Sequence, residues 1–78
     1  MIEIEKKLKH CLKKAFPKDK IPKNIVKLKI GNPKSWDSLG HVNFLLIIEK
    51  QFSIKISFKK ISELNDINKI LKFLKKEI

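Results

Sequence analysis

Ser38 and His41 are the residues whose types and spacing come closest to those of a catalytic pair. A serine hydroxyl becomes a nucleophile when a nearby histidine accepts its proton, and a three-residue helical spacing would place both side chains on one side. Such a pair would suggest a hydrolase. However, no Gly-x-Ser-x-Gly elbow surrounds Ser38 and no oxyanion hole is evident, so we predict no catalytic residue and no enzyme.

Cys11 is the second candidate for chemistry, and it is the only cysteine of the chain. A single cysteine can form neither an intramolecular disulfide nor a cysteine cluster for zinc, so we expect no metal. We interpret Cys11 as a small hydrophobe on a buried helix face.

The strongest compositional signal is a formal net charge of +11, which is typical of proteins that bind nucleic acid, anionic lipid or an acidic partner. All basic residues are lysine, whereas arginine supplies the bidentate contacts that favour base and phosphate recognition. Joint enrichment in lysine and isoleucine is equally typical of a compositional bias. A small basic nucleic-acid-binding module is therefore the alternative function, and we do not favour it, because no helix-turn-helix or aromatic stacking motif is recognisable.

A chain of 78 residues is enough for one compact domain, and we assign residues 1–78 to it. The longest apolar run, Phe44 to Ile48, is far shorter than the roughly 20 residues that span a bilayer. Glu3 and Glu5 stand where a secretory signal would be basic. We therefore expect a cytoplasmic protein with no membrane association, and a monomer.

The elements that would position Ser38 are predicted to be helices. Residues 2–16 place apolar side chains at spacings of three and four, as on one face of an amphipathic helix that Pro17 ends. These side chains are Ile4, Leu8, Cys11, Leu12, Ala15 and Phe16. From Pro17 to Asp37 the chain carries all three prolines and an Asn32-Pro33 turn signal, which predicts a long ordered connection.

A second helix should begin at Asp37 or Ser38, since either side chain can cap its first turn, and should end near Phe52. The residues expected to face the core are His41, Phe44, Leu45, Ile48 and Phe52. Leu39, Val42 and Leu46 extend the apolar surface beyond a single stripe, which is typical of a central helix or a docking surface. Trp36 is expected to pack as a lid over the helix start, with partner contact as the alternative.

Residues 52–58 alternate with period two as a strand does, but a lone strand lacks a partner unless residues 25–30 pair with it. We predict instead an extended crossing that inserts Ile54 and Ile56 into the core, and then a short helix near Phe58 to Leu64. A last helix is capped by Asn65 or Asp66 and places Ile67, Ile70, Leu71, Leu74 and Ile78 on one face. The predicted fold is an all-α, small four-helix bundle with three main helices, one short helix and a long first loop.

The segment from Trp36 to Ile56 resembles the acyl carrier protein family, of which this chain would be a divergent basic member. The resemblance rests on Asp37-Ser38-Leu39 at a helix start, the apolar residues Val42, Phe44 and Ile48, Glu49 three residues before Phe52, and the following Ile54 and Ile56. It extends more loosely over nearly the whole chain, because the long first loop and the short third helix also occur in that family. The resemblance implies a bundle of acyl-carrier type.

The resemblance also implies a function centred on Ser38. A phosphopantetheinyl transferase would attach 4′-phosphopantetheine from coenzyme A to Ser38, and acyl-loading and acyl-transferring enzymes would use the arm's thiol to carry acyl groups as thioesters. Asp37 would be an N-cap alone or would also be read by the transferase, and His41 would line the core or contact the phosphate. The residues implied for partner docking are Leu39, Val42, Leu46 and Glu49.

The chain departs from the family in the charge of this helix. Gly40, Asn43, Lys50 and Gln51 stand where acidic or polar-acidic residues are common in carriers of fatty-acid synthesis, and only Glu49 is acidic. We therefore expect a dedicated carrier in a specialised pathway of lipid, surface-glycan or secondary-metabolite biosynthesis. Its partners should present neutral or acidic docking faces.

Overall fold

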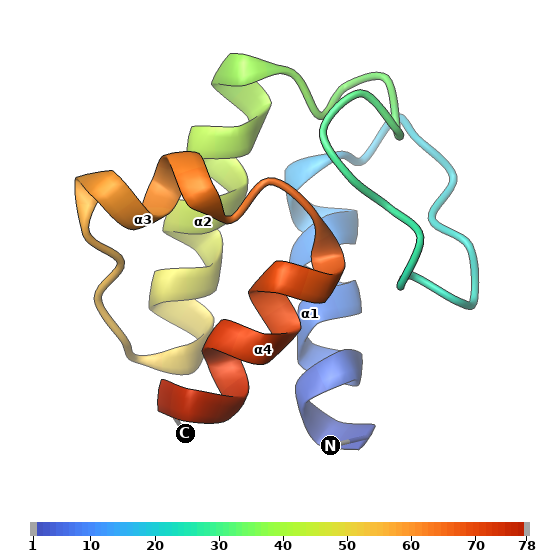
Figure 1. The fold of residues 1–78 in the computed structure, drawn as a ribbon. Helices are drawn as coiled ribbons and strands as arrows, with labels where there is room; N and C mark the ends of the chain where they lie inside the picture. Colours follow the sequence, from blue (N-terminus) through green and yellow to red (C-terminus); the bar gives the residue numbers. More distant parts are fainter. Residues whose placement is uncertain (1, 78) are drawn as a thin grey trace.

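The structure is a computed structural model that describes residues 2–77 of the chain. These residues form four helices and no strand: α1 (Ile2–Ala15), α2 (Ser38–Phe52), α3 (Phe58–Glu63) and α4 (Ile67–Glu77). Figure 1 shows α1, α2 and α4 as the body of the bundle, and α1 packs against both of the others. The predicted small helical bundle, with one short helix and a long first loop, is confirmed. No helix within residues 2–77 is long and apolar enough to cross a membrane.

The bounds of α1 follow from its sequence. The helix ends at Ala15, one residue earlier than predicted, and the backbone N–H of Phe16 still donates to the carbonyl of Leu12 at 2.9 Å. Pro17 has no N–H and cannot continue this ladder. Acidic residues in the first turn and lysines in the last turn complement the helix macrodipole.

The first loop, residues 16–37, packs beside the start of α4. The backbone N–H of Ile30 donates to the carbonyl of Asn65, and the N–H of Ile67 donates to the carbonyl of Leu28, both at 3.0 Å. Residues 25–30 therefore pair with the segment before α4 instead of with residues 52–58. This pairing satisfies loop backbone groups and buries Ile25 and Leu28.

After Ser53, the left-handed C-cap of α2, residues 54–57 form the predicted crossing between α2 and α3. Ile56 is buried and Ile54 is half-buried against the core, as predicted. Phe52 is only half-buried, with Nζ of Lys7 5.5 Å from its ring centroid, so it contributes less to the core than its spacing predicts.

One hydrophobic core joins the three long helices and the first loop. Its buried apolar residues are Leu8, Cys11, Leu12, Phe16, Ile25, Leu28, Trp36, Phe44, Leu45, Ile48, Ile56, Leu64, Ile67, Ile70, Leu71 and Leu74. Ile78, which was predicted for the core face of the last helix, lies outside the described residues. The core holds the start of α2 against α1 through Phe16, Trp36 and Phe44, whose rings pack with centroids 5.1–5.9 Å apart.

Candidate functional site

The start of α2 is fixed by Asp37, which is the N-cap. Its backbone is extended, with φ −102° and ψ −169°, and its Oδ1 accepts a hydrogen bond from the N–H of Gly40 at 2.8 Å. The Asp37 carbonyl accepts from the N–H of His41 at 2.7 Å. The predicted capping role of Asp37 is therefore confirmed, and it makes Ser38 the first residue of the helix.

Ser38 is exposed at this helix start. Within the described residues its hydroxyl forms no hydrogen bond, and the backbone N–H groups of Ser38 and Leu39 also have no partner there. Free N–H groups at the positive end of a helix favour an anion. The arrangement therefore offers an accessible hydroxyl at a place where an attached phosphate is electrostatically favoured.

His41 lies beneath the helix start and is only 5% exposed. Its Nδ1 accepts a hydrogen bond from Nε1 of Trp36 at 2.9 Å, so the proton of the neutral ring resides on Nε2, which donates to the Ile61 carbonyl at 2.6 Å. The predicted core position of His41 is confirmed. Because both nitrogens are engaged, accepting a proton from Ser38 or contacting a phosphate there would require breaking one of these bonds.

Trp36 is fully buried and belongs to the core, where a lid over the helix start was expected. Its ring stacks on Phe16 with an interplanar angle of 27° and meets Phe44 edge-on at 79°. The Trp36 carbonyl accepts from the N–H of Gly31 at 2.8 Å. The segment before Ser38 is therefore held in place by the packing of the Trp36 ring and by the backbone hydrogen bond between Gly31 and Trp36.

Gly40 is a site residue that the sequence did not identify as structural. A Cβ at this position would overlap the carbonyl oxygen of Ser35 and would lie 3.0 Å from Cε1 of Phe16. The N–H of Ser35 donates to Oδ2 of Asp19 at 3.2 Å, which ties this part of the loop to the residues after α1. The loop therefore crosses so close to α2 that only glycine fits. The sequence signal was a glycine inside a helical pattern, which is costly without such a reason.

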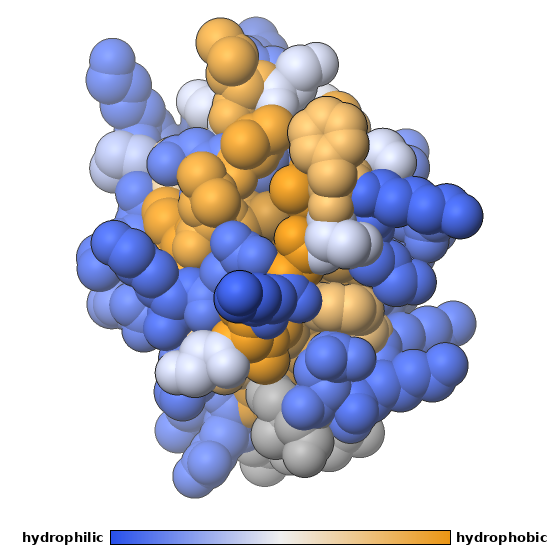
Figure 2. Space-filling model, turned by 90° about the vertical axis from the view of Figure 1, so that its left-hand side faces the viewer, coloured by the Kyte–Doolittle hydropathy of each residue, from blue (hydrophilic) through white to orange (hydrophobic). Residues whose placement is uncertain are grey.

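The residues predicted to dock partners lie on the outer side of α2. Leu39 is 84% exposed, Leu46 is 51% exposed and Val42 is 44% exposed, and we call these three the α2 apolar face. Phe58, at the start of α3, is 92% exposed and was not predicted to contribute. Figure 2 shows that apolar side chains gather on the side of the molecule formed by α2 and α3, with hydrophilic side chains around them.

Glu49 has a structural role in addition to its predicted place in docking. Its Oε2 accepts a hydrogen bond from the N–H of Ile56 at 2.6 Å, and its carbonyl accepts from the N–H of Ile54 at 3.2 Å. The side chain thereby holds the crossing between α2 and α3. It also borders an open groove of about 600 Å³ with Asn43, Leu46, Ile47, Lys50, Ile54 and Lys55.

Cys11 is fully buried in α1, as predicted. Burial raises the pKa of its thiol from 9.0 to about 11, although the positive charges of Lys14 and Lys7 act in the opposite direction. A thiol with this pKa is a poor nucleophile at neutral pH. Among the described residues no three metal-ligating side chains cluster.

Comparisons with protein-family models, with curated proteins and with solved structures found no match to this chain. The site itself is therefore the basis for a proposed function. Its parts are an exposed serine hydroxyl at a capped helix start, an adjoining exposed apolar face, and a histidine committed to the core.

Proposed function

We propose that this protein is a carrier that bears 4′-phosphopantetheine on Ser38 and holds acyl intermediates as thioesters on the thiol of that arm. The observation that carries the proposal is the exposed Ser38 hydroxyl, which forms no hydrogen bond within residues 2–77 and lies directly after the N-cap Asp37 and beside the exposed Leu39. Modification by a separate transferase requires an accessible hydroxyl and a docking surface next to it, and needs no activating base in the carrier itself.

The electrostatics of the helix start support a phosphodiester at Ser38. Its negative charge would lie at the positive end of the α2 macrodipole, which favours an anion by about 0.3–1 kcal/mol. The N–H groups of Ser38 and Leu39, which have no partner among the described residues, are available to the phosphate oxygens, since Asp37 accepts from the N–H of Gly40.

The charge of α2 supports partners other than strongly basic enzymes. The helix contains one acidic residue, Glu49, whose carboxylate is engaged with Ile56, and one basic residue, Lys50. The α2 apolar face therefore offers hydrophobic contact without a row of carboxylates. We propose acyl-loading and acyl-transferring partners with neutral or acidic docking faces, in a specialised biosynthetic pathway.

Intact-mass measurement tests the attachment directly. The chain is coexpressed with a broad-specificity phosphopantetheinyl transferase, and we expect a mass increase of one phosphopantetheine group. Ser38→Ala should abolish the increase, and Ser62→Ala, which removes an exposed serine of α3, should leave it unchanged. A chain that gains no mass, or a gain that persists in Ser38→Ala, overturns the proposal.

The docking role of the α2 apolar face is tested by the rate of the same modification. Leu46→Ser should slow phosphopantetheinylation by about tenfold, the effect of losing a contact worth about 1.4 kcal/mol. Ile30→Ser is the matched control, because Ile30 is 40% exposed but lies in the first loop. Equal rates for the two variants would remove Leu46 from the docking surface.

A further inference from the structure

A second surface feature lies away from Ser38, in an open groove of about 640 Å³ between α3 and α4. Five exposed lysines line it: Lys60, Lys69, Lys72, Lys75 and Lys76. No residue of α2 lines this groove, and Figure 1 places the start of α2 at the top of the bundle and the end of α4 at the bottom, so the groove is separate from the proposed attachment site. We call it the α3–α4 groove.

The charge of the α3–α4 groove is poorly compensated. Glu63 is the only acidic residue in its lining, and it pairs with Lys60 at 3.3 Å, which is the only ion pair found within residues 2–77. Lys69 donates to the neutral side chain of Asn65 at 3.1 Å. Several ammonium groups thus face the same concave surface with no carboxylate partner there, which makes the groove a site of positive potential.

The groove also has an apolar part. Leu64 is buried and Phe73 is half-buried beneath the exposed lysines. Nζ of Lys60 lies 5.9 Å from the centroid of the Phe73 ring. A ligand that fits this surface therefore combines negative charge with at least one apolar side chain, because an apolar floor under a charged rim is the usual design of a protein-binding site.

We propose that the α3–α4 groove binds an acidic segment of a partner protein that inserts an apolar side chain over Leu64 and Phe73. Charge complementarity with the lysines is the reason for proposing an acidic segment. Lysine ammonium groups attract carboxylates as point charges but lack the planar fork that reads bases and phosphates, and Phe73 is the single aromatic residue in the groove lining, so there is no row of rings on which successive bases stack. A flat bilayer surface does not enter a concave groove.

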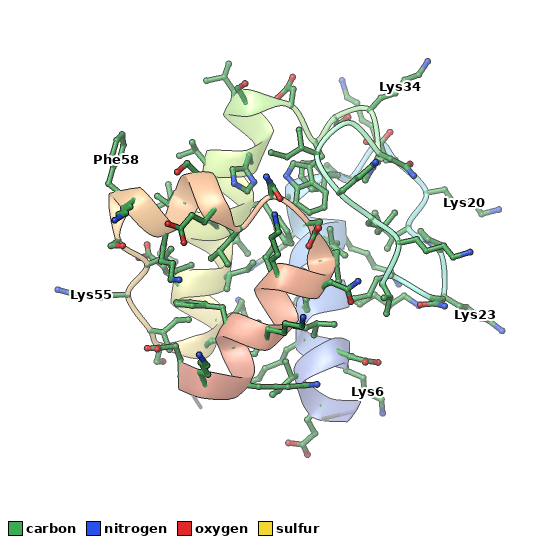
Figure 3. All side chains as sticks on the ribbon, viewed as in Figure 1. Lys6, Lys20, Lys23, Lys34, Lys55 and Phe58 are labelled. Carbon is green, nitrogen blue, oxygen red and sulfur yellow. The ribbon has the colours of Figure 1, made fainter. Side chains whose placement is uncertain are left out.

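The test uses the full chain and a fluorescein-labelled synthetic peptide of Asp and Glu residues around a central Leu-Phe pair. Binding is followed by fluorescence anisotropy at an ionic strength of about 0.15 M, where the Debye length of about 8 Å suppresses diffuse attraction. The groove variant is Lys69→Gln/Lys72→Gln/Lys76→Gln. The matched control is Lys6→Gln/Lys20→Gln/Lys23→Gln, which lowers the net charge by the same amount as the groove variant. Its three lysines belong to α1 and the first loop, away from α3 in Figure 3.

We expect the peptide to bind the wild-type chain and the control alike, and to bind the groove variant at least about tenfold more weakly. A peptide with Ser-Ser in place of Leu-Phe should also bind more weakly. Circular dichroism checks the fold, and both triple variants should remain helical. The Ser38→Ala variant should bind the peptide as the wild-type chain does, so failure of this proposal is distinguishable from failure of the carrier proposal.

Three results would overturn the inference. The first is no peptide binding at this ionic strength, and the second is an equal loss in both triple variants, which would indicate diffuse charge attraction. The third is groove-dependent binding that is tighter to single-stranded DNA, or to phosphatidylserine-containing vesicles, than to the peptide. That result would assign the groove to a nucleic acid or to a lipid surface.

Discussion

The indole of Trp36 donates a hydrogen bond to Nδ1 of His41, and the two rings lie at an interplanar angle of 22° with centroids 6.0 Å apart. Trp36 belongs to the first loop and His41 to α2, and the second ring nitrogen of His41 bonds to Ile61 in α3. Two side chains therefore connect three parts of the chain beneath Ser38. In a domain of this size such a buried polar connection fixes how the helix start sits on the core.

Trp36→Phe should lower the free energy of unfolding by about 1–3 kcal/mol, because it leaves the buried Nδ1 of His41 without a donor and removes packed volume. A double-mutant cycle with His41→Phe isolates the hydrogen bond. In urea denaturation, the double variant should lose less unfolding free energy than the sum of the losses in the two single variants. Strict additivity would mean that Trp36 acts through packing alone.

Asp37→Ala should destabilise the protein by about 0.5–2 kcal/mol through loss of the N-cap, whereas Asp37→Asn retains an acceptor for the N–H of Gly40 and should stay close to wild type. The pair also separates the cap from the proposed recognition by a transferase. If Asp37→Asn folds normally but is modified slowly, the enzyme reads the carboxylate. If Asp37→Asn folds normally and is modified at the wild-type rate, Asp37 serves as a cap only.

Gly40→Ala should be destabilising by about 1–3 kcal/mol, although alanine is the better helix former by about 1 kcal/mol. The added Cβ would overlap the Ser35 carbonyl, so the loop must move away from α2. Asn43→Ala is the control, since Asn43 is exposed in the same helix and should gain stability slightly. Thermal denaturation in which both variants gain stability would contradict the close approach.

The helix pattern was predictable because it depends on short-range features. Asp37 caps α2, Pro17 limits α1, and Asp66 accepts the N–H of Lys69 at 2.7 Å to cap α4. Each of these signals acts within a few residues of the helix end it sets, so one sequence is enough to read it.

The remainder was unpredictable because it depends on the path of the first loop. Trp36 lies in the core because the first loop crosses α2 near Gly40. His41 bonds to the Ile61 carbonyl because α3, 20 residues further along the chain, packs against α2. The exposed phenyl ring of Phe58 likewise follows from where α3 begins after the crossing. These contacts join residues that are far apart in the sequence, so no local spacing of residue types predicts them.

Glu49→Ala should lower stability by about 1.5–3 kcal/mol, the range of a hydrogen bond to a charged group, because the N–H of Ile56 loses its acceptor. Glu49→Gln keeps a side-chain oxygen for this bond and should retain most of the stability. Hydrogen exchange at the Ile56 amide is the local readout, and it should accelerate in the alanine variant. An unchanged exchange rate there would leave Glu49 with only its predicted docking role.

Cys11 should make stability fall as the pH rises through alkaline values. Burial raises the pKa of its thiol from 9.0 to about 11, so between these values the unfolded chain releases a proton that the folded protein keeps. The unfolded state then binds fewer protons, and the free energy of unfolding decreases with pH, by as much as about 2–3 kcal/mol from this group. Below pH 9 the thiol is largely protonated in both states, so its contribution to the free energy of unfolding is fully present.

The readout is the difference between the wild-type chain and Cys11→Ala in urea denaturation at a series of pH values. The lysines titrate in both proteins, so their effect cancels in this difference, and the alanine variant loses a constant amount of packing at every pH. We expect the stability gap between the two proteins to narrow as the pH rises from 9 toward 11. A gap that stays constant across this range would show that the thiol ionises equally well in the folded and unfolded states, contrary to its burial among Leu8, Leu12 and the rest of the core.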